Sequence, residues 1–459
     1  MMTRISILYG CALGLVLTSG LGTVNAADAT AAQNWHQWRG PLANGVAPLA
    51  DPPLKWSETE NVKWKVKTPG FGTSTPIIWG DKLFLITAIP TGKKTEAKPA
   101  TPAAGQPAPA AGNNPRRGGG GRSEVPDEVY QFTVMCLDRK TGKTLWQKVA
   151  REQVPHEGHH QDHGFASASP TTDGKLLLAY FGSRGLYCYD LDGNLKWEKD
   201  FGDMRTRNNF GEGTSPVLSG DTVIINWDHE GADFIVALDK NTGKELWRKE
   251  RDEPTSWSTP LVVTHDGKTQ VVVNATGKVR SYDVATGAVL WEVGGQTVNA
   301  IPSPVTADGV VYVMSGFRGS MLQAIKLGRT GDLAGTDALL WTHDKSTPYV
   351  PSPLLYDGQL YFLAANSGIL SSFDVKTGKA LINAERLPGV SGVYASPVGA
   401  KDRVYLLGRE GTALVLKKGA PLEVLATNKL DDRTDSSIAA VGKELFIRGH
   451  QYLYCIAEN

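Results

Sequence analysis

The sequence predicts an all-β protein, an eight-bladed β-propeller of four-stranded antiparallel blades. Three observations lead to this fold. The hairpin motif Asp-x-x-Thr-Gly-x-x-Leu-Trp, seen in residues 238–247, returns along the chain with small variations. The tryptophans that end the motif fall mostly 44 to 51 residues apart, and a Ser/Thr-Pro step opens each repeat. A period of this length, with four short strands per repeat, is typical of propeller blades.

The hairpin motif corresponds to the two outer strands of a blade. In residues 238–247, Gly243 supplies the positive φ angle that closes the loop, and Asp239 can bond the backbone of its own turn. Related hairpins occupy residues 137–146, 189–197, 282–291 and 373–382, the last with Ile382 in the tryptophan's place. The anchors are Trp64, Trp146, Trp197, Trp247, Trp291 and Trp341.

The Ser/Thr-Pro step marks the start of the innermost strand, because proline is tolerated at the first residue of a strand. Ser436-Ser437 takes the eighth place without a proline. The other seven steps begin at Thr75, Ser169, Ser215, Thr259, Ser303, Ser352 and Ser396. These markers give eight repeats.

The two ends of the chain predict how the ring closes. The last repeat, residues 436–457, has three strands and lacks an outer one. The strand around Trp64, residues 62–66, precedes the first Ser/Thr-Pro step and lacks inner strands. We therefore expect the N-terminal strand to complete the last blade, which removes two open sheet edges.

Two repeats depart from the pattern. Residues 90–128 are rich in Pro, Ala, Gly and charge, and such a segment cannot bury enough apolar surface to order itself. We predict a disordered insertion there, between the second and third strands of blade one. Blade five, residues 303–341, is predicted to have a lengthened outer hairpin.

The first 26 residues read as a secretory signal peptide, with cleavage after Ala26. Residues 27–60 form a lead-in, and residues 61–459 form the propeller. The expected location is periplasmic or secreted, and whether Cys11 carries a lipid is left open. The three later cysteines, Cys136, Cys188 and Cys455, are an odd number at equivalent places, so we expect buried reduced thiols.

Charge and hydropathy exclude some partners. The chain has 48 basic and 47 acidic residues, which does not favour nucleic acid. No stretch after the leader approaches the ~18 apolar residues of a transmembrane helix. We expect a monomer that meets a small-molecule or protein ligand.

A family resemblance adds to this interpretation. Trp35 and the run from Gln37 to Pro41, ahead of the repeated hairpins, resemble exported bacterial proteins with pyrroloquinoline quinone (PQQ) type repeats. The resemblance covers nearly all of the mature chain and implies the propeller fold. Similar repeats occur in quinoprotein dehydrogenases and in a non-enzymatic outer-membrane assembly factor. The resemblance therefore leaves the activity open.

The least ordinary side chains are expected on one face of the disc. Blade-to-blade links and the turns between second and third strands share that face, and loops on a rigid scaffold concentrate binding residues. One link carries four histidines and an aspartate within eight residues. The metal candidates are His156, His159, His160, Asp162, His163 and His229. Imidazole and carboxylate suit a transition metal, although a polar surface loop is the simpler explanation of the link.

A second set of residues on this face has the types that hold a quinone cofactor with Ca²⁺. The set is Arg184, Asn209, Asp228, Glu230, Trp257, Asn299 and Arg318. Carboxylate and amide oxygens bind a hard cation, an indole stacks on a planar ring, and guanidinium groups hold carboxylates. The alternative is structural: the arginines pair with acids of neighbouring blades, and Trp257 is a lid.

Two functions follow from these candidates. We favour a ligand- or protein-binding scaffold with a His/Asp/Arg-decorated top face, because it needs only a rigid ring. The alternative is a PQQ- and Ca²⁺-dependent dehydrogenase of alcohols or sugars. The adjacent-cysteine disulfide of many quinoprotein alcohol dehydrogenases is absent from the sequence, which counts against it.

Overall fold

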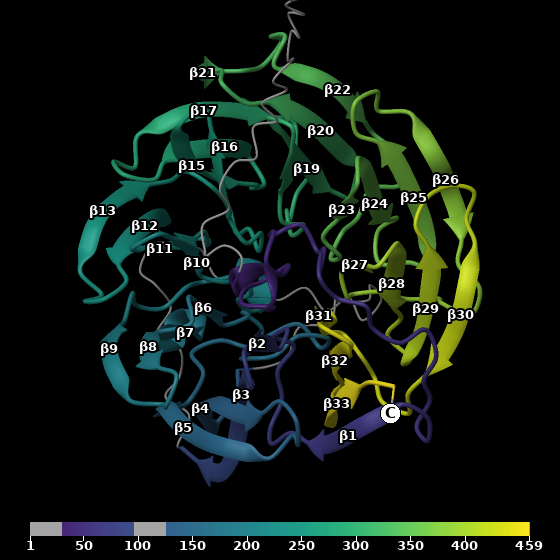
Figure 1. Ribbon diagram of the computed structural model, residues 1–459. Helices are drawn as coiled ribbons and strands as arrows, with labels where there is room; N and C mark the ends of the chain where they lie inside the picture. The colour runs from purple at the N-terminus through teal and green to yellow at the C-terminus, as the bar shows by residue number, and fades with distance from the viewer. Residues whose placement is uncertain (1–29, 96–124, 459) are drawn as a thin grey trace, which may run out of the picture.

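The chain forms a ring of eight β-sheets in the computed structural model, which describes residues 30–95 and 125–458 (Figure 1). The predicted fold is confirmed: each sheet contains four antiparallel strands in order from the axis to the rim, and one sheet has a short fifth strand. The signal peptide and the middle of the predicted insertion lie outside the described residues.

The strands follow one another along the chain. Blade one contains β2 (Ile77–Trp79), β3 (Lys82–Lys94), β4 (Glu128–Asp138) and β5 (Thr144–Gln153). Blade two contains β6 (Thr171–Thr172), β7 (Leu176–Tyr180), β8 (Leu186–Asp190) and β9 (Leu195–Lys199). Blade three contains β10 (Val217–Ser219), β11 (Thr222–Trp227), β12 (Phe234–Asp239) and β13 (Glu245–Glu250). Blade four contains β14 (Leu261–His265), β15 (Lys268–Val273), β16 (Lys278–Asp283) and β17 (Val289–Gly294).

The second half repeats the order. Blade five contains β18 (Val305–Ala307), β19 (Val310–Ser315), β20 (Met321–Lys326) and β22 (Leu339–His343). Blade six contains β23 (Leu354–Tyr356), β24 (Gln359–Leu363), β25 (Ile369–Asp374) and β26 (Ala380–Arg386). Blade seven contains β27 (Val398–Ala400), β28 (Arg403–Leu407), β29 (Thr412–Lys417) and β30 (Val424–Lys429). Blade eight contains β31 (Ala439–Val441), β32 (Glu444–Arg448), β33 (Tyr452–Ile456) and the N-terminal β1 (Val62–Lys67).

Ring closure occurs as the sequence predicts. Strand β1 pairs antiparallel with β33, and Trp64 lies opposite Cys455 (Figure 1). The first and last strands of the ring therefore belong to one sheet.

The tryptophans dock neighbouring blades. Each indole packs on the glycine of the next blade's outer turn and donates its N–H to a backbone carbonyl there. The indoles of Trp64, Trp146, Trp197, Trp247 and Trp341 bond the carbonyls of Arg139, Leu191, Lys240, Val284 and Val375, at 2.8–3.1 Å. Trp291 faces blade five, which has no such turn, and its indole N–H donates to the side-chain oxygen of Gln270 in its own sheet instead (2.9 Å).

The core lies between neighbouring sheets. The inner three strands of each blade are largely buried, whereas the outer strand β13 is exposed except at Trp247. Cys136, Cys188 and Cys455 are free and buried in this core, as predicted. Burial raises the pKa of the Cys136 and Cys188 thiols to about 12, so they are poor nucleophiles.

Two loops refine the sequence prediction. The insertion in blade one is narrower than residues 90–128, because β3 and β4 pair as far as Lys94 and Glu128. The lengthened hairpin of blade five is present. It contributes β21 (Gly331–Asp332), which pairs in parallel with β17 as a fifth strand of blade four.

Candidate functional site

A ring of hydroxyl groups lines the inside of the propeller. At six blade-to-blade steps, the Ser or Thr before an innermost strand accepts a hydrogen bond from the equivalent backbone N–H one blade earlier. The pairs, donor first, are Thr75–Ser169, Ser169–Ser215, Ser215–Thr259, Ser303–Ser352, Ser352–Ser396 and Ser396–Ser437, at 2.9–3.0 Å. The Ser/Thr-Pro steps that mark the repeats thus build the wall of a central channel.

The N-terminal segment closes one end of this channel. Trp35 exchanges two backbone hydrogen bonds with Ile78 of β2. The indole N–H of Trp38 donates to the Ser303 hydroxyl at 3.0 Å. The buried Arg39 donates to the carbonyls of Pro353 and Pro397, each at 2.8 Å, and burial lowers its pKa to about 9. In Figure 1 the segment, in purple, lies over the centre of the ring.

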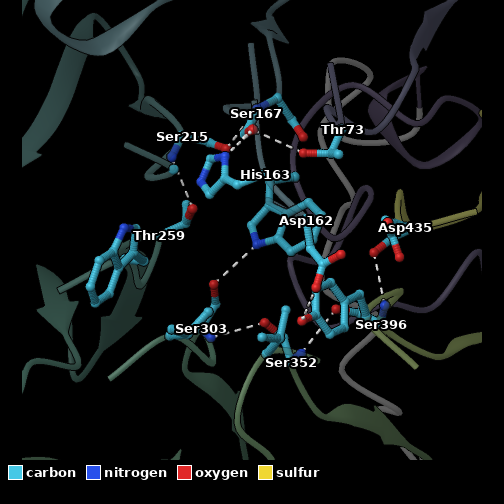
Figure 2. Close-up of a pocket in the computed structure, with 18 of the residues that line it drawn as sticks. Thr73, Asp162, His163, Ser167, Ser215, Thr259, Ser303, Ser352, Ser396 and Asp435 are labelled. Carbon is cyan, nitrogen blue, oxygen red and sulfur yellow. Dashed lines mark hydrogen bonds between the residues drawn. The ribbon is translucent and has the colours of Figure 1, made fainter. Parts of the chain in front are cut away.

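A cavity of about 200 Å³ lies in the channel above Trp38. Hydroxyl groups of the ring and residues of the blade-to-blade links line it together (Figure 2). The link residues that line it are His160, Asp162, His163, Phe210, Trp257, Tyr349, Tyr394 and Asp435. The cavity therefore combines hydroxyls, imidazoles and aromatic rings.

His163 lines the cavity, and neighbouring groups hold its imidazole ring. Its Nδ1 accepts the backbone N–H of Gly164 at 2.7 Å, and the Ser167 hydroxyl lies 2.8 Å from the same atom. Nδ1 also lies 2.9 Å from the Gly164 carbonyl oxygen, so these contacts suit either tautomer of a neutral ring. Burial lowers the pKa of His163 to about 4, which keeps the ring neutral near pH 7.

A cluster of ion pairs surrounds the mouth of the channel. Asp162, in the link between blades one and two, contacts Arg409 of blade seven at 2.7 Å and Arg433 of the next link at 2.5 Å. Asp435 pairs with the same two arginines and with His450 at 2.9 Å. The Arg409 guanidinium also lies 3.8 Å above the ring of Tyr394. We call these residues, Asp162, Arg409, Arg433, Asp435 and His450, the mouth cluster.

The six metal candidates do not form one site. His160, Asp162 and His163 line the channel cavity, whereas Nδ1 of His159 contacts the carbonyl of His160. His229 accepts the backbone N–H of Arg205 at 3.0 Å. His156 lies beside Glu157 and Glu212, two residues that sequence reasoning did not select. Burial raises the pKa of both glutamates to about 7.

The seven cofactor candidates share the predicted face but do not converge. Trp257 lines the cavity and donates its indole N–H to Gly211 at 2.7 Å. Asp228 forms a fully buried ion pair with Arg251. Arg184 is buried and contacts Asp203. The remaining four make local contacts in links and turns. The Glu230 carboxylate accepts a hydrogen bond from the Thr255 hydroxyl, and the Asn299 amide donates one to the Tyr349 hydroxyl. The Arg318 guanidinium lies over the Phe317 ring, and Asn209 is the last residue of the 3-10 helix η2 (Arg207–Asn209).

Sequence reasoning missed several residues of the cavity. The ring hydroxyls belong to the Ser/Thr-Pro steps, and the position of these steps before each innermost strand predicts that they lie near the axis. Trp38 and Asp435 carried no such signal, since nothing local shows that the lead-in enters the channel or that Asp435 lies at its mouth. Asp162 and Arg409 are 247 residues apart, so their contact depends on the closed ring.

Comparison with known proteins identifies the family of the chain. A family model described as outer membrane protein assembly factor BamB matches residues 130–380, more than half of the chain. The curated BamB of Moranella endobia is 26% identical over 208 residues, which are 40% of this chain and 50% of that protein. The chain thus spans about half the length of the curated relative it matches.

The fold is shared with a solved structure of BamB. The crystal structure of BamB from Moraxella catarrhalis matches with a TM-score of 0.51 and 15% identity, over 73% of this chain and 93% of that one. A europium-containing methanol dehydrogenase matches with a TM-score of 0.47 and 13% identity, over 87% and 92% of the two chains. By its repeats, its propeller and the match over residues 130–380, the chain belongs to the family of the outer membrane protein assembly factor BamB.

Proposed function

We propose that this protein is a non-enzymatic scaffold that binds another protein on the face where the channel opens. One observation carries the proposal: the two ends of the channel differ. Its own N-terminal segment occupies one end, whereas links from several blades surround the other. The open face is therefore the one available to a partner.

The open face has the properties of a protein-binding surface. The mouth cluster ties links of distant blades together, so the face is held rigid and loses little conformational entropy on binding. Arginine and aromatic side chains, which are enriched at interfaces, lie around it. Arg205 and Arg318 are exposed there, and Phe317 stacks on Tyr349 with ring centroids 4.7 Å apart.

The relatives indicate the cellular process in which this chain acts. They are assembly factors for outer-membrane proteins, and we infer that this chain acts in the same process, exported by the signal peptide expected in residues 1–26. In the described part of the chain, no helix has the length and apolarity needed to cross a bilayer. The dehydrogenase alternative receives no support from the site, because its candidate residues are separated and Asp228 is committed to Arg251.

Site-specific crosslinking tests the proposal. A photoreactive residue would replace Arg205 or Arg318 on the open face, and Lys244 or Lys376 in outer turns of the opposite face. We expect the first two positions, in the cell envelope, to crosslink to a component of the outer-membrane protein assembly machinery. Arg205→Glu with Arg318→Glu should weaken that crosslink at least tenfold. Equal crosslinking from both faces would contradict the proposal.

A further inference from the structure

We propose that His156, Glu157 and Glu212 form a binding site for a divalent transition metal ion, outside the channel cavity. Each residue offers one ligand atom, and the three atoms lie within 4.8 Å of one another. His156 and Glu157 come from the link between β5 and β6, and Glu212 from the link between β9 and β10. One imidazole with two carboxylates suits Zn²⁺ or Mn²⁺.

The charges of the site favour a cation. Glu157 is 7% exposed, and the Glu212 side chain is 18% exposed. Their hydrogen-bond partners are neutral: Glu157 accepts from the backbone N–H and hydroxyl of Thr206, and Glu212 from those of Ser183. Among the described residues, neither carboxylate has a lysine or arginine within ion-pair distance. Two adjacent buried carboxylates are costly unless protons or a cation neutralise them.

The third ligand, His156, faces the carboxylates. Its Nε2 lies 4.0 Å from Oε1 of Glu212 and 2.5 Å from the carbonyl oxygen of Met204. Its Nδ1 lies 2.7 Å from the Arg184 guanidinium and 3.6 Å from the Asp203 carboxylate. Metal binding at Nε2 displaces the contact with Met204 and places the ring proton on Nδ1. The Arg184 guanidinium, which donates to Nδ1 in this structure, must then turn away, and Asp203 must move closer from 3.6 Å to accept the proton. A carboxylate that accepts the second ring N–H of a ligating histidine is a common feature of metal sites.

The surroundings have room for one ion. A cavity of about 30 Å³ is lined by all three residues and by the glycines 158, 182 and 211. Metal–ligand bonds of ~2.1 Å put ligand atoms roughly 3–4 Å apart, so the three side chains need to move inward by less than about 1 Å. A bound ion would join the histidine-rich link to the next link and so brace the open face.

Metal titration of the purified full-length mature chain tests the site. After chelation and dialysis, calorimetry with ZnCl₂ and with MnCl₂ should show one equivalent bound, and saturating Zn²⁺ should raise the melting temperature. Glu157→Gln and Glu212→Gln keep the shape of the site and should weaken binding at least 100-fold. Asp203→Asn should weaken it about 10- to 100-fold. Circular dichroism of the metal-free variants verifies that they fold.

Two controls separate this site from other metal-binding positions. Glu230→Gln alters a carboxylate of the same face outside the site and should leave the titration unchanged. His160→Gln with His163→Gln removes the imidazoles of the channel cavity and should also leave it unchanged. The proposal is wrong if the mature chain binds neither ion, or if binding survives Glu212→Gln and is lost with the channel histidines.

Discussion

At the scale of single residues, Asp228 shows how burial decides the role of a charged side chain. Its carboxylate lies 2.6 Å from Nε of Arg251 and also accepts the Ser256 hydroxyl at 2.5 Å and the Asn226 amide at 3.0 Å. The side chains of Asp228 and Arg251 are 0% exposed. The carboxylate is therefore occupied by protein groups and serves to hold blade three to its outgoing link.

Removing the Asp228 carboxylate should strongly destabilise the folded protein. Asp228→Ala leaves the Arg251 charge buried without its partner, so we expect the free energy of unfolding to fall by about 3–5 kcal/mol. Asp221→Ala breaks an exposed ion pair with Lys240 in the same blade and should cost no more than about 1 kcal/mol. Urea unfolding of both variants measures the difference. Similar losses would show that the buried pair contributes no more than a surface one.

His163 should make stability depend on pH. Its pKa is about 4 in the folded protein and 6.5 in an unfolded chain, because burial disfavours the charged ring. Between these values the unfolded state binds more protons, so stability falls as the pH falls from 6.5 toward 4, by at most about 3 kcal/mol. His163→Gln should flatten this slope in urea unfolding measured across the same range. An unchanged slope would mean that the ring is protonated inside the folded protein.

At the scale of elements, the outer hairpin is both the most predictable part of the chain and the joint between blades. Asp239 accepts the backbone N–H and hydroxyl of Thr242, which fixes the turn from within one short segment. The turn then presents Gly243 to the indole of Trp197, from the blade before. One local motif therefore encodes both a turn and its docking surface.

Substitutions at two glycines distinguish the role of the turn conformation from the role of the indole contact. A Cβ on Gly243 would lie 2.7 Å from the Trp197 ring, whereas a Cβ on Gly220 meets nothing within 4 Å. Both have positive φ, 69° and 59°, so alanine should cost about 1–2 kcal/mol at each from backbone strain. Gly243→Ala should cost about 1–3 kcal/mol more, because the indole must move. If both variants lose the same free energy of unfolding in denaturant, close packing of the indole on Gly243 does not contribute to stability.

The difference between local, repeated signals and contacts between distant segments explains what could be predicted from the sequence. Turns, strand order and the number of blades follow from local signals that repeat, and the structure confirms them. The lead-in and β21 have no repeat to reveal their partners: Trp38 bonds Ser303, 265 residues away, and Gly331 pairs with Trp291. Topology predicts that the candidate residues share one face, and four of them, His160, Asp162, His163 and Trp257, line the channel cavity. The roles of the others could not be predicted, because the contacts that commit Asp228 or gather Asp162 and Arg409 cross between links.

At the scale of the whole molecule, stability depends on closing the ring. Strand β1 contributes the fourth strand of blade eight, and Trp64 from it packs on Gly142 of blade one. Without β1, the edge of β33 would be exposed and blade one would lose its neighbour's indole. Ahead of β1, Trp35 and Trp56 are buried in the same core cluster, so the lead-in stabilises this joint as well.

A pair of truncations distinguishes these contributions. A chain that begins at residue 61 loses the lead-in and keeps β1; it should melt at a lower temperature but keep the oligomeric state of the full-length chain and unfold in one transition. A chain that begins at residue 68 also loses β1, and its open edge should make it aggregate or become sensitive to protease. A synthetic peptide of residues 61–67 should restore protection to the second chain, because it can pair with β33. If both chains resist protease equally, closure of the ring by β1 is not what holds the blades together.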